Sequence, residues 1–140
     1  MEIPHPSTTV LFIDGHKADR QYWVQRLKIS SPDYVVLEAD TGAAGLAICR
    51  SQVVDCVISE LTLTDMSGFE VLVQLIPRAR HPEIGFIFLT RLTLGPMKHL
   101  ALGNGAHAYL TKPYSSGDEL DITIHKALAS VGASRKEPRS

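Results

Sequence analysis

The stretch VVDCVISELTLTDMSGFEVL, residues 53–72, contains the pattern that decides the fold. Its apolar run CVIS (56–59) predicts a short buried strand, and the lone carboxylate of Glu60 follows where that run stops. Ser67 and Glu70 then have the spacing of a capping box, which predicts the start of an amphipathic helix. A buried strand, a loop that carries one charge and a helix together make one unit of an α/β protein.

The same alternation of strand and helix continues on both sides of this stretch. Short apolar runs predict strands, and apolar residues at helical spacing or capping residues predict a helix after each strand. The predicted strands are 9–13, 34–39, 56–59, 84–90 and 108–112. The predicted helices are 17–28, 41–50, 67–78, one within 95–102 that closes at Gly103, and 116–130. Uniformly apolar strands and short loops predict a doubly wound α/β fold with a five-stranded parallel sheet.

Composition is that of an ordinary soluble globular protein. Hydrophobic residues make up 44% of the 140 residues and charged residues 21%, which argues against a disordered chain. The net charge of −1 gives no electrostatic reason to expect direct binding to nucleic acid or to a membrane surface. The sequence shows neither a membrane-spanning apolar stretch nor a signal peptide. Cys49 and Cys56 are predicted to be buried free thiols, which fits a cytoplasmic protein.

The chain is expected to form one domain. Residues 1–8 contain two prolines and predict a flexible lead-in, and residues 9–131 predict the folded domain. The polar segment 132–140 is predicted to be a tail or the start of a linker. A DNA-binding domain does not fit beside this domain in 140 residues. The chain is therefore expected to be a single-domain protein or a fragment of a longer one.

Polar side chains follow four of the predicted strands: Asp14, Glu60, Thr90 and Lys112. Open parallel sheets bind their ligands outside the carboxyl ends of the strands, at the point where the strand order reverses. With the order 2-1-3-4-5, Asp14 and Glu60 would face each other there, and Thr90 and Lys112 would close the site from the other side. The alternative is that each residue is a strand-end polar group that meets solvent.

Residues 9–130 resemble the receiver domain of two-component response regulators. The resemblance lies in VLFIDGHKADR (10–20), DCVISELTLTDMSGFEVL (55–72), IFLTR (87–91) and GAHAYLTKPY (105–114). It implies a flavodoxin-like fold of strand order 2-1-3-4-5 and a bacterial-type, non-enzymatic module of phosphorelay signal transduction.

The resemblance also implies protein partners: a sensor kinase, an output domain or a second copy of the chain. In the family, partners commonly bind the face formed by the fourth helix, the fifth strand and the fifth helix. Here that face would include Leu94, Met97, Leu100, Tyr109 and parts of 115–130.

The resemblance implies a role for each residue at the strand ends. Glu60 falls on the phosphoacceptor position, Asp14 on the first acid that holds Mg²⁺, and the backbone carbonyl of Thr62 on the remaining metal ligand. Thr90 falls on the switch hydroxyl of the phosphate pocket and Tyr109 on the aromatic switch. Lys112 falls on the lysine that pairs with the acceptor, and its bond to Pro113, often cis in the family, would present that lysine rigidly.

Three positions depart from the family pattern. Gly15 stands where the family usually has a second acid, Glu60 where it has aspartate, and Arg91 where it has a small residue. One carboxylate fewer predicts weak or absent Mg²⁺ binding. Glu60 also carries its carboxylate about 1.5 Å further than aspartate would. Because phosphoryl transfer depends on placement, slow or absent phosphorylation is expected.

Three interpretations of Glu60 stay open. It could pair with Lys112 and accept a hydrogen bond from Thr90, which would partly imitate the phosphorylated state. It could belong to a dead site kept by its packing, or it could itself be phosphorylated with a weakened Mg²⁺ site. Arg91 could supply a second cation or block a phosphodonor.

Two alternatives outside phosphorylation are also open. One is a transition-metal site formed by His16, Asp14 and Glu60. The other is a small flavin-binding module, although DGHKADR (14–20) lacks the Ser/Thr/Gly-rich cradle that a flavin phosphate needs.

Overall fold

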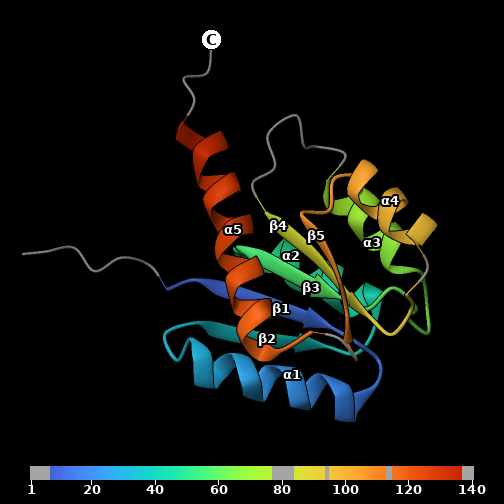
Figure 1. Cartoon of the computed structure of the whole chain (residues 1–140), viewed down its shortest axis with the longest axis horizontal. Coiled ribbons are helices and arrows are strands. Elements are labelled where there is room, and N and C mark those ends of the chain that lie inside the picture. Colours follow the sequence, from blue (N-terminus) through green and yellow to red (C-terminus); the bar gives the residue numbers. More distant parts are fainter. Residues whose placement is uncertain (1–6, 77–83, 94, 113–114, 137–140) are drawn as a thin grey trace, which may run out of the picture.

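The computed structural model describes residues 7–76, 84–93, 95–112 and 115–136, in which five strands alternate with five helices (Figure 1). The strands are β1 (Thr9–Ile13), β2 (Val35–Ala39), β3 (Cys56–Ser59), β4 (Gly85–Thr90) and β5 (Ala108–Thr111). The helices are α1 (Lys17–Ser30), α2 (Gly42–Ser51), α3 (Gly68–Leu75), α4 (Gly95–Gly103) and α5 (Gly117–Lys136). The predicted alternation is confirmed.

The strands form one parallel sheet in the order β2-β1-β3-β4-β5, as predicted. In its centre β1 pairs with β3, with Val10 opposite Cys56 and Ile13 opposite Ser59. Because every strand runs the same way, all five carboxyl ends reach one edge of the sheet (Figure 1). The order reverses between β1 and β3, so the residues that follow these two strands are neighbours at that edge.

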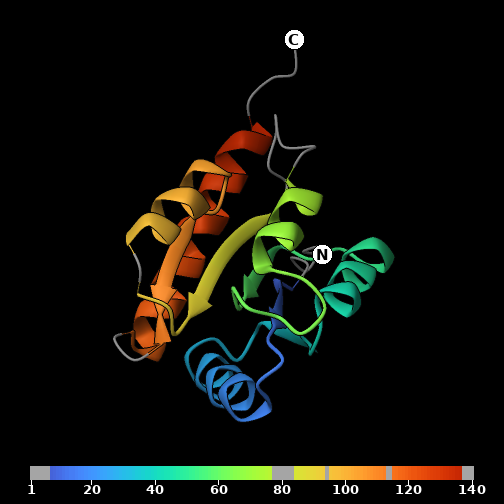
Figure 2. The same ribbon diagram turned by 90° about the vertical axis from the view of Figure 1, so that its right-hand side faces the viewer.

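Apolar side chains pack on both faces of the sheet. Val10 and Ile58 point to the face that α1 and α5 cover, whereas Leu11 and Val57 point to the face covered by α2, α3 and α4. Successive residues alternate between the faces, so a strand buried on both faces must be apolar throughout. Figure 1 shows α1 close to α5, and Figure 2 shows α2 (teal) beside α3 (green).

Side-chain caps begin the helices where the sequence predicts them. The hydroxyl of Thr41 accepts a hydrogen bond from the Ala44 amide at 3.1 Å at the start of α2. Ser67 accepts from the Glu70 amide at 3.2 Å before α3, and Ser116 accepts from the Glu119 amide at 3.0 Å before α5. Each cap satisfies an amide that has no partner inside its helix.

A second cap joins the loop after β3 to α2. The carboxylate of Asp65 accepts hydrogen bonds from the amides of Gly42 and Ala43, both at 2.9 Å. The bonds from Ala43 and Gly42 hold the pKa of Asp65 below its usual value. The loop that follows Glu60 is therefore attached to the N-terminus of a neighbouring helix.

The ends of α1 and α3 differ from the predicted ones. α1 continues two residues past the predicted end at residue 28, to Ser30. α3 ends at Leu75 rather than near residue 78, because Pro77 has no amide hydrogen to continue the helix. The predicted residues 77 and 78 lie outside the described residues.

The last helix is longer than predicted. α5 runs to Lys136, into the segment 132–140 that was predicted to be a tail or linker. Gly132 costs about 1 kcal/mol in a helix but does not end it, and the next helix-breaking residue in the sequence is Pro138. Whether this segment leads to a further domain stays a prediction.

Cys49 and Cys56 are free cysteines, as predicted, but only Cys56 is fully buried and Cys49 is partly exposed. Burial raises the pKa of the Cys49 thiol to about 11 and that of the Cys56 thiol to about 12, so both are uncharged at neutral pH. Among the helices of the described ranges, none has the length and apolar character needed to cross a membrane.

Candidate functional site

The four predicted strand-end residues gather at the carboxyl edge of the sheet. Asp14, Thr90 and Lys112 are buried, and the side chain of Glu60 is only 12% exposed. The interpretation that each of them meets solvent separately is therefore wrong. Their positions follow from the strand order, because β1 and β3 are adjacent and β4 and β5 continue the same side of the sheet.

The ammonium group of Lys112 lies between the two predicted carboxylates. Its Nζ is 2.7 Å from Oδ2 of Asp14 and 2.7 Å from Oε2 of Glu60. Desolvation by burial lowers the pKa of Lys112, but its bonds to Asp14, Glu60 and Asp19 outweigh this, so its pKa lies above the usual value. The lysine is therefore charged, and it neutralises carboxylates that would otherwise repel each other at the switch point.

Glu60 uses both of its carboxylate oxygens. Oε2 contacts Lys112, while Oε1 accepts hydrogen bonds from the Thr90 hydroxyl and, at 2.9 Å, from the Leu61 amide. Three donors thus hold the carboxylate at the end of β3. The two contacts of the imitation interpretation, Glu60 with Lys112 and Glu60 with Thr90, are both present.

The backbone beneath Glu60 depends on a glycine. A methyl group on Gly68 would lie 2.5 Å from the carbonyl oxygen of Glu60, 2.8 Å from the ring of Phe88 and 3.1 Å from the Cα of Leu61. Two of these three contacts involve backbone, which cannot move without displacing the loop that carries Glu60. Gly68 therefore lets α3 approach the end of β3.

We expect Gly68→Ala to lower the free energy of unfolding by about 1–3 kcal/mol, the usual cost of overpacking a buried position. Urea unfolding measures the change. Gly103→Ala is the matched control, because a methyl group there meets nothing within 4 Å. Equal unfolding midpoints for the two variants would contradict the prediction.

A third carboxylate, which the sequence did not reveal, joins Asp14 and Glu60 around Lys112, and we call these four residues the cluster. Asp19 lies in the first turn of α1, and its Oδ2 is 3.0 Å from Nζ of Lys112. An acid in the first turn of a helix is common because it interacts well with the helix dipole, so its presence there gave no signal of a site. Asp14, Asp19 and Glu60 therefore all contact Lys112, one carboxylate more than the two predicted at the strand ends.

Arg91 contacts Asp19 rather than the phosphoacceptor position. Its Nε and Nη2 donate to the two oxygens of Asp19 at 3.1 and 2.8 Å, and its side chain is 64% exposed. Desolvation raises the pKa of Asp19, but the hydrogen bonds from Arg91 and Lys112 outweigh this and bring it below its usual value. Arg91 thus adds a second cation at the solvent side of the cluster.

His16 begins α1 as its N-cap. Its Nδ1 accepts a hydrogen bond from the Asp19 amide at 3.2 Å, and its own amide donates to Oδ1 of Asp14 at 2.8 Å. Over the described part of the chain, no group of three or more His, Cys, Asp and Glu side chains is arranged to hold a metal ion. The transition-metal interpretation with His16, Asp14 and Glu60 is therefore wrong for this arrangement.

The residues as arranged do not fit Mg²⁺ either. Gly15 has no side-chain oxygen, and Asp14 and Glu60 are both bound to Lys112, whereas Mg²⁺ needs six oxygen ligands in near-octahedral geometry. Thr62 pairs with Ser67 in an isolated antiparallel bridge. The role of its carbonyl as a metal ligand stays a prediction.

Tyr109, the predicted aromatic switch, is buried and connected to the site. Its hydroxyl donates to the carbonyl of Leu92 at 2.8 Å, and its ring lies 6.1 Å from that of Phe88. The Leu92 amide in turn donates to the Thr90 hydroxyl at 3.3 Å. Glu60, Thr90, Leu92 and Tyr109 thus form one chain of contacts that leads to β5. Pro113, and with it the bond from Lys112, lies outside the described residues.

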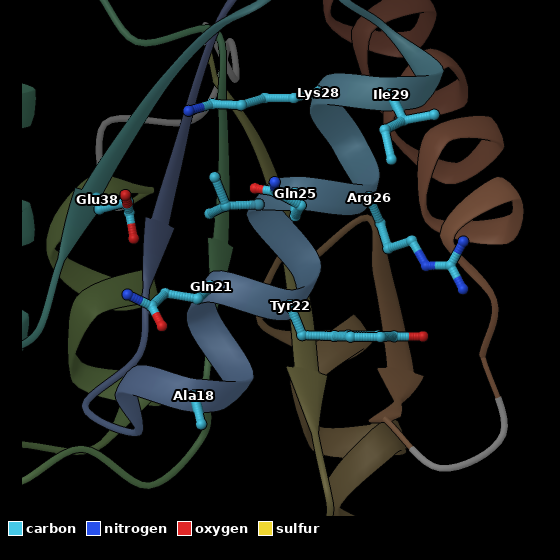
Figure 3. Close-up of a pocket in the computed structure, with 9 residues that line it drawn as sticks. Ala18, Gln21, Tyr22, Gln25, Arg26, Lys28, Ile29 and Glu38 are labelled. Carbon is cyan, nitrogen blue, oxygen red and sulfur yellow. The ribbon is translucent and has the colours of Figure 1, made fainter.

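An open groove runs along the exposed side of α1, away from the cluster (Figure 3). Tyr22, Arg26 and Ile29 project toward α5, while Gln21 and Lys28 project toward β2, which carries Glu38. The guanidinium of Arg26 lies 5.5 Å from the centre of the Tyr22 ring, a cation–π distance. The groove is lined by neutral, basic and acidic side chains and shares no lining residue with the cluster.

Comparison with known proteins finds one family and many similar structures. The response regulator receiver domain matches residues 10–124. The chain is 32% identical over 102 residues to the transcriptional regulatory protein GlrR of Escherichia coli K12, covering 73% of this chain and 22% of GlrR. It is 33% identical over 99 residues to the cell cycle response regulator CtrA of Brucella ovis, covering 71% of this chain and 41% of CtrA. The chain thus spans less than half the length of these relatives.

A solved structure shows the same fold. A response regulator receiver domain protein from Clostridium thermocellum superposes with a TM-score of 0.80 at 26% identity. The match covers 90% of this chain and 98% of that one.

Proposed function

Because this chain belongs to the response regulator receiver domain family, we propose that it is an atypical receiver which signals by binding a protein partner without being phosphorylated. The observation that carries the proposal is the coordination of Glu60. Its two oxygens take the Lys112 ammonium, the Thr90 hydroxyl and the Leu61 amide. These donors are the ones that a phosphoryl group on a shorter acceptor would attract, so Glu60 imitates the phosphorylated state.

The contacts beyond Glu60 support the same proposal. The Thr90 hydroxyl is turned toward Glu60, and Tyr109 is buried with its hydroxyl bonded to the Leu92 carbonyl. A switch threonine and a switch tyrosine that both point inward are what the imitation requires. The closed arrangement then needs no phosphodonor, and the weak or absent binding of Mg²⁺ that we propose does not impair it.

We place the partner surface on α4, β5 and α5. Tyr109 in β5 connects this surface to Glu60 through Leu92 and Thr90. On α4, Leu100 has half of its surface exposed, which suits a protein contact. Leu94 of the predicted face lies outside the described residues. The partner is a sensor kinase, an output domain or a second copy of this chain, and we expect the interaction in the cytoplasm without direct contact to nucleic acid or membrane.

Incubation with acetyl phosphate and Mg²⁺, followed by intact mass measurement, tests the proposal. We expect no stoichiometric gain of about 80 Da, the mass of one phosphoryl group. The Glu60 carboxylate is bound by three donors, and Gly15 leaves the cation site one ligand short. Glu60→Gln serves as the control, because it keeps the shape and removes the nucleophile.

An adduct on the wild type that Glu60→Gln abolishes would contradict the proposal. It would instead support the alternative function, a receiver that is phosphorylated on Glu60 with a weakened Mg²⁺ site. An adduct that persists in Glu60→Gln would lie on another residue, and it would equally contradict the proposal that the chain signals without being phosphorylated.

A further inference from the structure

We propose that Asp19 is the positioning residue of this site: its carboxylate binds Lys112 and Arg91 together and so keeps Lys112 on Glu60. This inference rests on the proposed function, since it explains how the closed arrangement is maintained. It assigns a role to two residues, Asp19 and Arg91, that lie outside the strand-end pattern.

The first argument is the number of donors on Lys112. An ammonium group has three N–H donors and no acceptor. Carboxylate oxygens of Asp14, Glu60 and Asp19 lie 2.7, 2.7 and 3.0 Å from Nζ. Asp14 and Asp19 accept hydrogen bonds from it and Glu60 forms an ion pair with it, so three carboxylates surround the three donors. The Lys112 side chain is only 5% exposed, and water cannot easily replace a lost partner. Without Asp19, one buried N–H would be left unsatisfied, and the ammonium could rotate or shift away from Glu60.

The second argument is the geometry between Asp19 and Arg91. Two parallel N–H···O bonds connect the guanidinium to both oxygens of Asp19, at 3.1 and 2.8 Å. Such bidentate pairs hold a carboxylate in one orientation. The oxygen that accepts from Nε of Arg91 is also the one that contacts Lys112. Arg91 therefore orients the oxygen that Asp19 offers to the buried lysine.

The third argument is the attachment of the first turn of α1. The Asp19 amide donates to His16, and the His16 amide donates to Asp14 at the end of β1. Arg20 also donates to the carbonyl oxygen of Asp14, at 2.5 Å, and pairs with Glu38 of β2 at 3.0 Å. These bonds attach the turn to both strands, so the Asp19 carboxylate is presented from a rigid element.

The consequence is a connection between α1 and the loop after β4. Arg91 directly follows Thr90, and Leu92, the next residue, holds the hydroxyl of Tyr109. Asp19 thus restrains two of the groups that contact Glu60. It binds Lys112 directly, and through Arg91 it restrains the backbone next to Thr90. In this arrangement an acid on a helix replaces the acid that is missing at Gly15, and it binds cationic side chains instead of a metal ion.

Side-chain NMR of the full chain labelled with ¹⁵N tests the proposal. In the wild type we expect a signal from the Lys112 ammonium and a slowly exchanging Nε–H of Arg91, both measured at one fixed, slightly acidic pH. In Asp19→Asn, exchange of both groups should accelerate by on the order of tenfold, the effect of losing a hydrogen bond to a charged group. Asp121→Asn is the matched control, because it makes the same acid-to-amide change at a residue whose contacts, with Ser31 and His125, do not touch Lys112.

A second variant separates positioning from general loosening of the fold. Arg91→Gln should accelerate Lys112 exchange less than Asp19→Asn does, and the double variant should be no faster than Asp19→Asn, because both changes act through one carboxylate. Additive effects, unchanged Lys112 exchange in Asp19→Asn, or an equal effect of Asp121→Asn would each overturn the proposal. Failure of the proposed function would appear separately, as a phosphoryl adduct on Glu60 of the wild type.

Discussion

Replacement of Lys112 by methionine is expected to lower the free energy of unfolding by about 3 kcal/mol at neutral pH, the usual cost of removing one partner from a buried ion pair. Methionine fills a similar volume but leaves Asp14, Asp19 and Glu60 close together without the cation that lies 2.7–3.0 Å from each of them. Urea unfolding followed by circular dichroism measures the loss. Lys126→Met on the exposed side of α5 is the control, and it should change stability by less than about 0.5 kcal/mol.

The pH dependence of this loss follows from two pKa shifts. Burial raises the pKa of Asp19, but Arg91 and Lys112 lower it further than burial raises it, so in the folded state it lies below its ordinary value of 3.8. The stability from its ion pairs is therefore present above pH 3.8 and is lost as the pH falls through the lowered pKa. The pKa of Lys112 is raised above its ordinary value of 10.5. The stability that its ion pairs contribute is therefore present below pH 10.5 and is lost only as the pH rises through the raised pKa.

The free energies of unfolding of the wild type and of Lys112→Met should therefore differ most across the neutral pH range. Below pH 3.8 the difference should shrink, because protonation of Asp19 removes its ion pair with Lys112 in the wild type. A difference that stays constant from about pH 7 to well below pH 3.8 would mean that Lys112 stabilises the fold by packing and not by charge.

The sheet and the strand-end residues could be predicted because each depends on a local signal. CVIS (56–59) is apolar throughout since α helices cover both of its faces, and the Ser67 cap marks the start of α3 within one residue. Once the strand order was assumed, Asp14, Glu60, Thr90 and Lys112 had to meet, because parallel strands end at the same edge. Here sequence and topology together were sufficient.

The role of Asp19 and the pairing of Arg91 with it could not be predicted in this way. Asp19 is three residues into a helix whose exposed side also carries charge, and only the packing of α1 against the sheet brings it to Lys112. Arg91 can rotate about several bonds, so its pairing with Asp19 instead of Glu60 depends on a partner 72 positions earlier in the chain. The missed element of the site is thus a contact between distant residues, for which neither one has a signature of its own.

In the double variant Gly15→Asp, Glu60→Asp, we expect phosphorylation by acetyl phosphate and Mg²⁺ to be on the order of 100-fold faster than in the wild type. Aspartate at 60 withdraws the carboxylate by about one C–C bond. That leaves space between it, Thr90 and Lys112, which the Glu60 oxygens fill in the wild type. Aspartate at 15 adds a carboxylate. Its Cβ would lie 3.9 Å from the Thr64 methyl but only 3.2 Å from the Asp40 carbonyl oxygen, so the backbone at Asp40 must shift slightly to accept it.

The two single variants test whether both departures matter. Phosphorylation of Glu60→Asp alone should remain slow, since Mg²⁺ would still lack one carboxylate ligand. Phosphorylation of Gly15→Asp alone should also remain slow, since Glu60 would still occupy Lys112 and Thr90. The rate of mass gain distinguishes these cases, and Arg91→Ala in the double background tests for obstruction by Arg91. If the folded double variant takes up no phosphoryl group even with Arg91→Ala, then Gly15 and Glu60 are not what prevents phosphorylation. Asp19, which would still hold Lys112, would then be the residue that keeps the site closed.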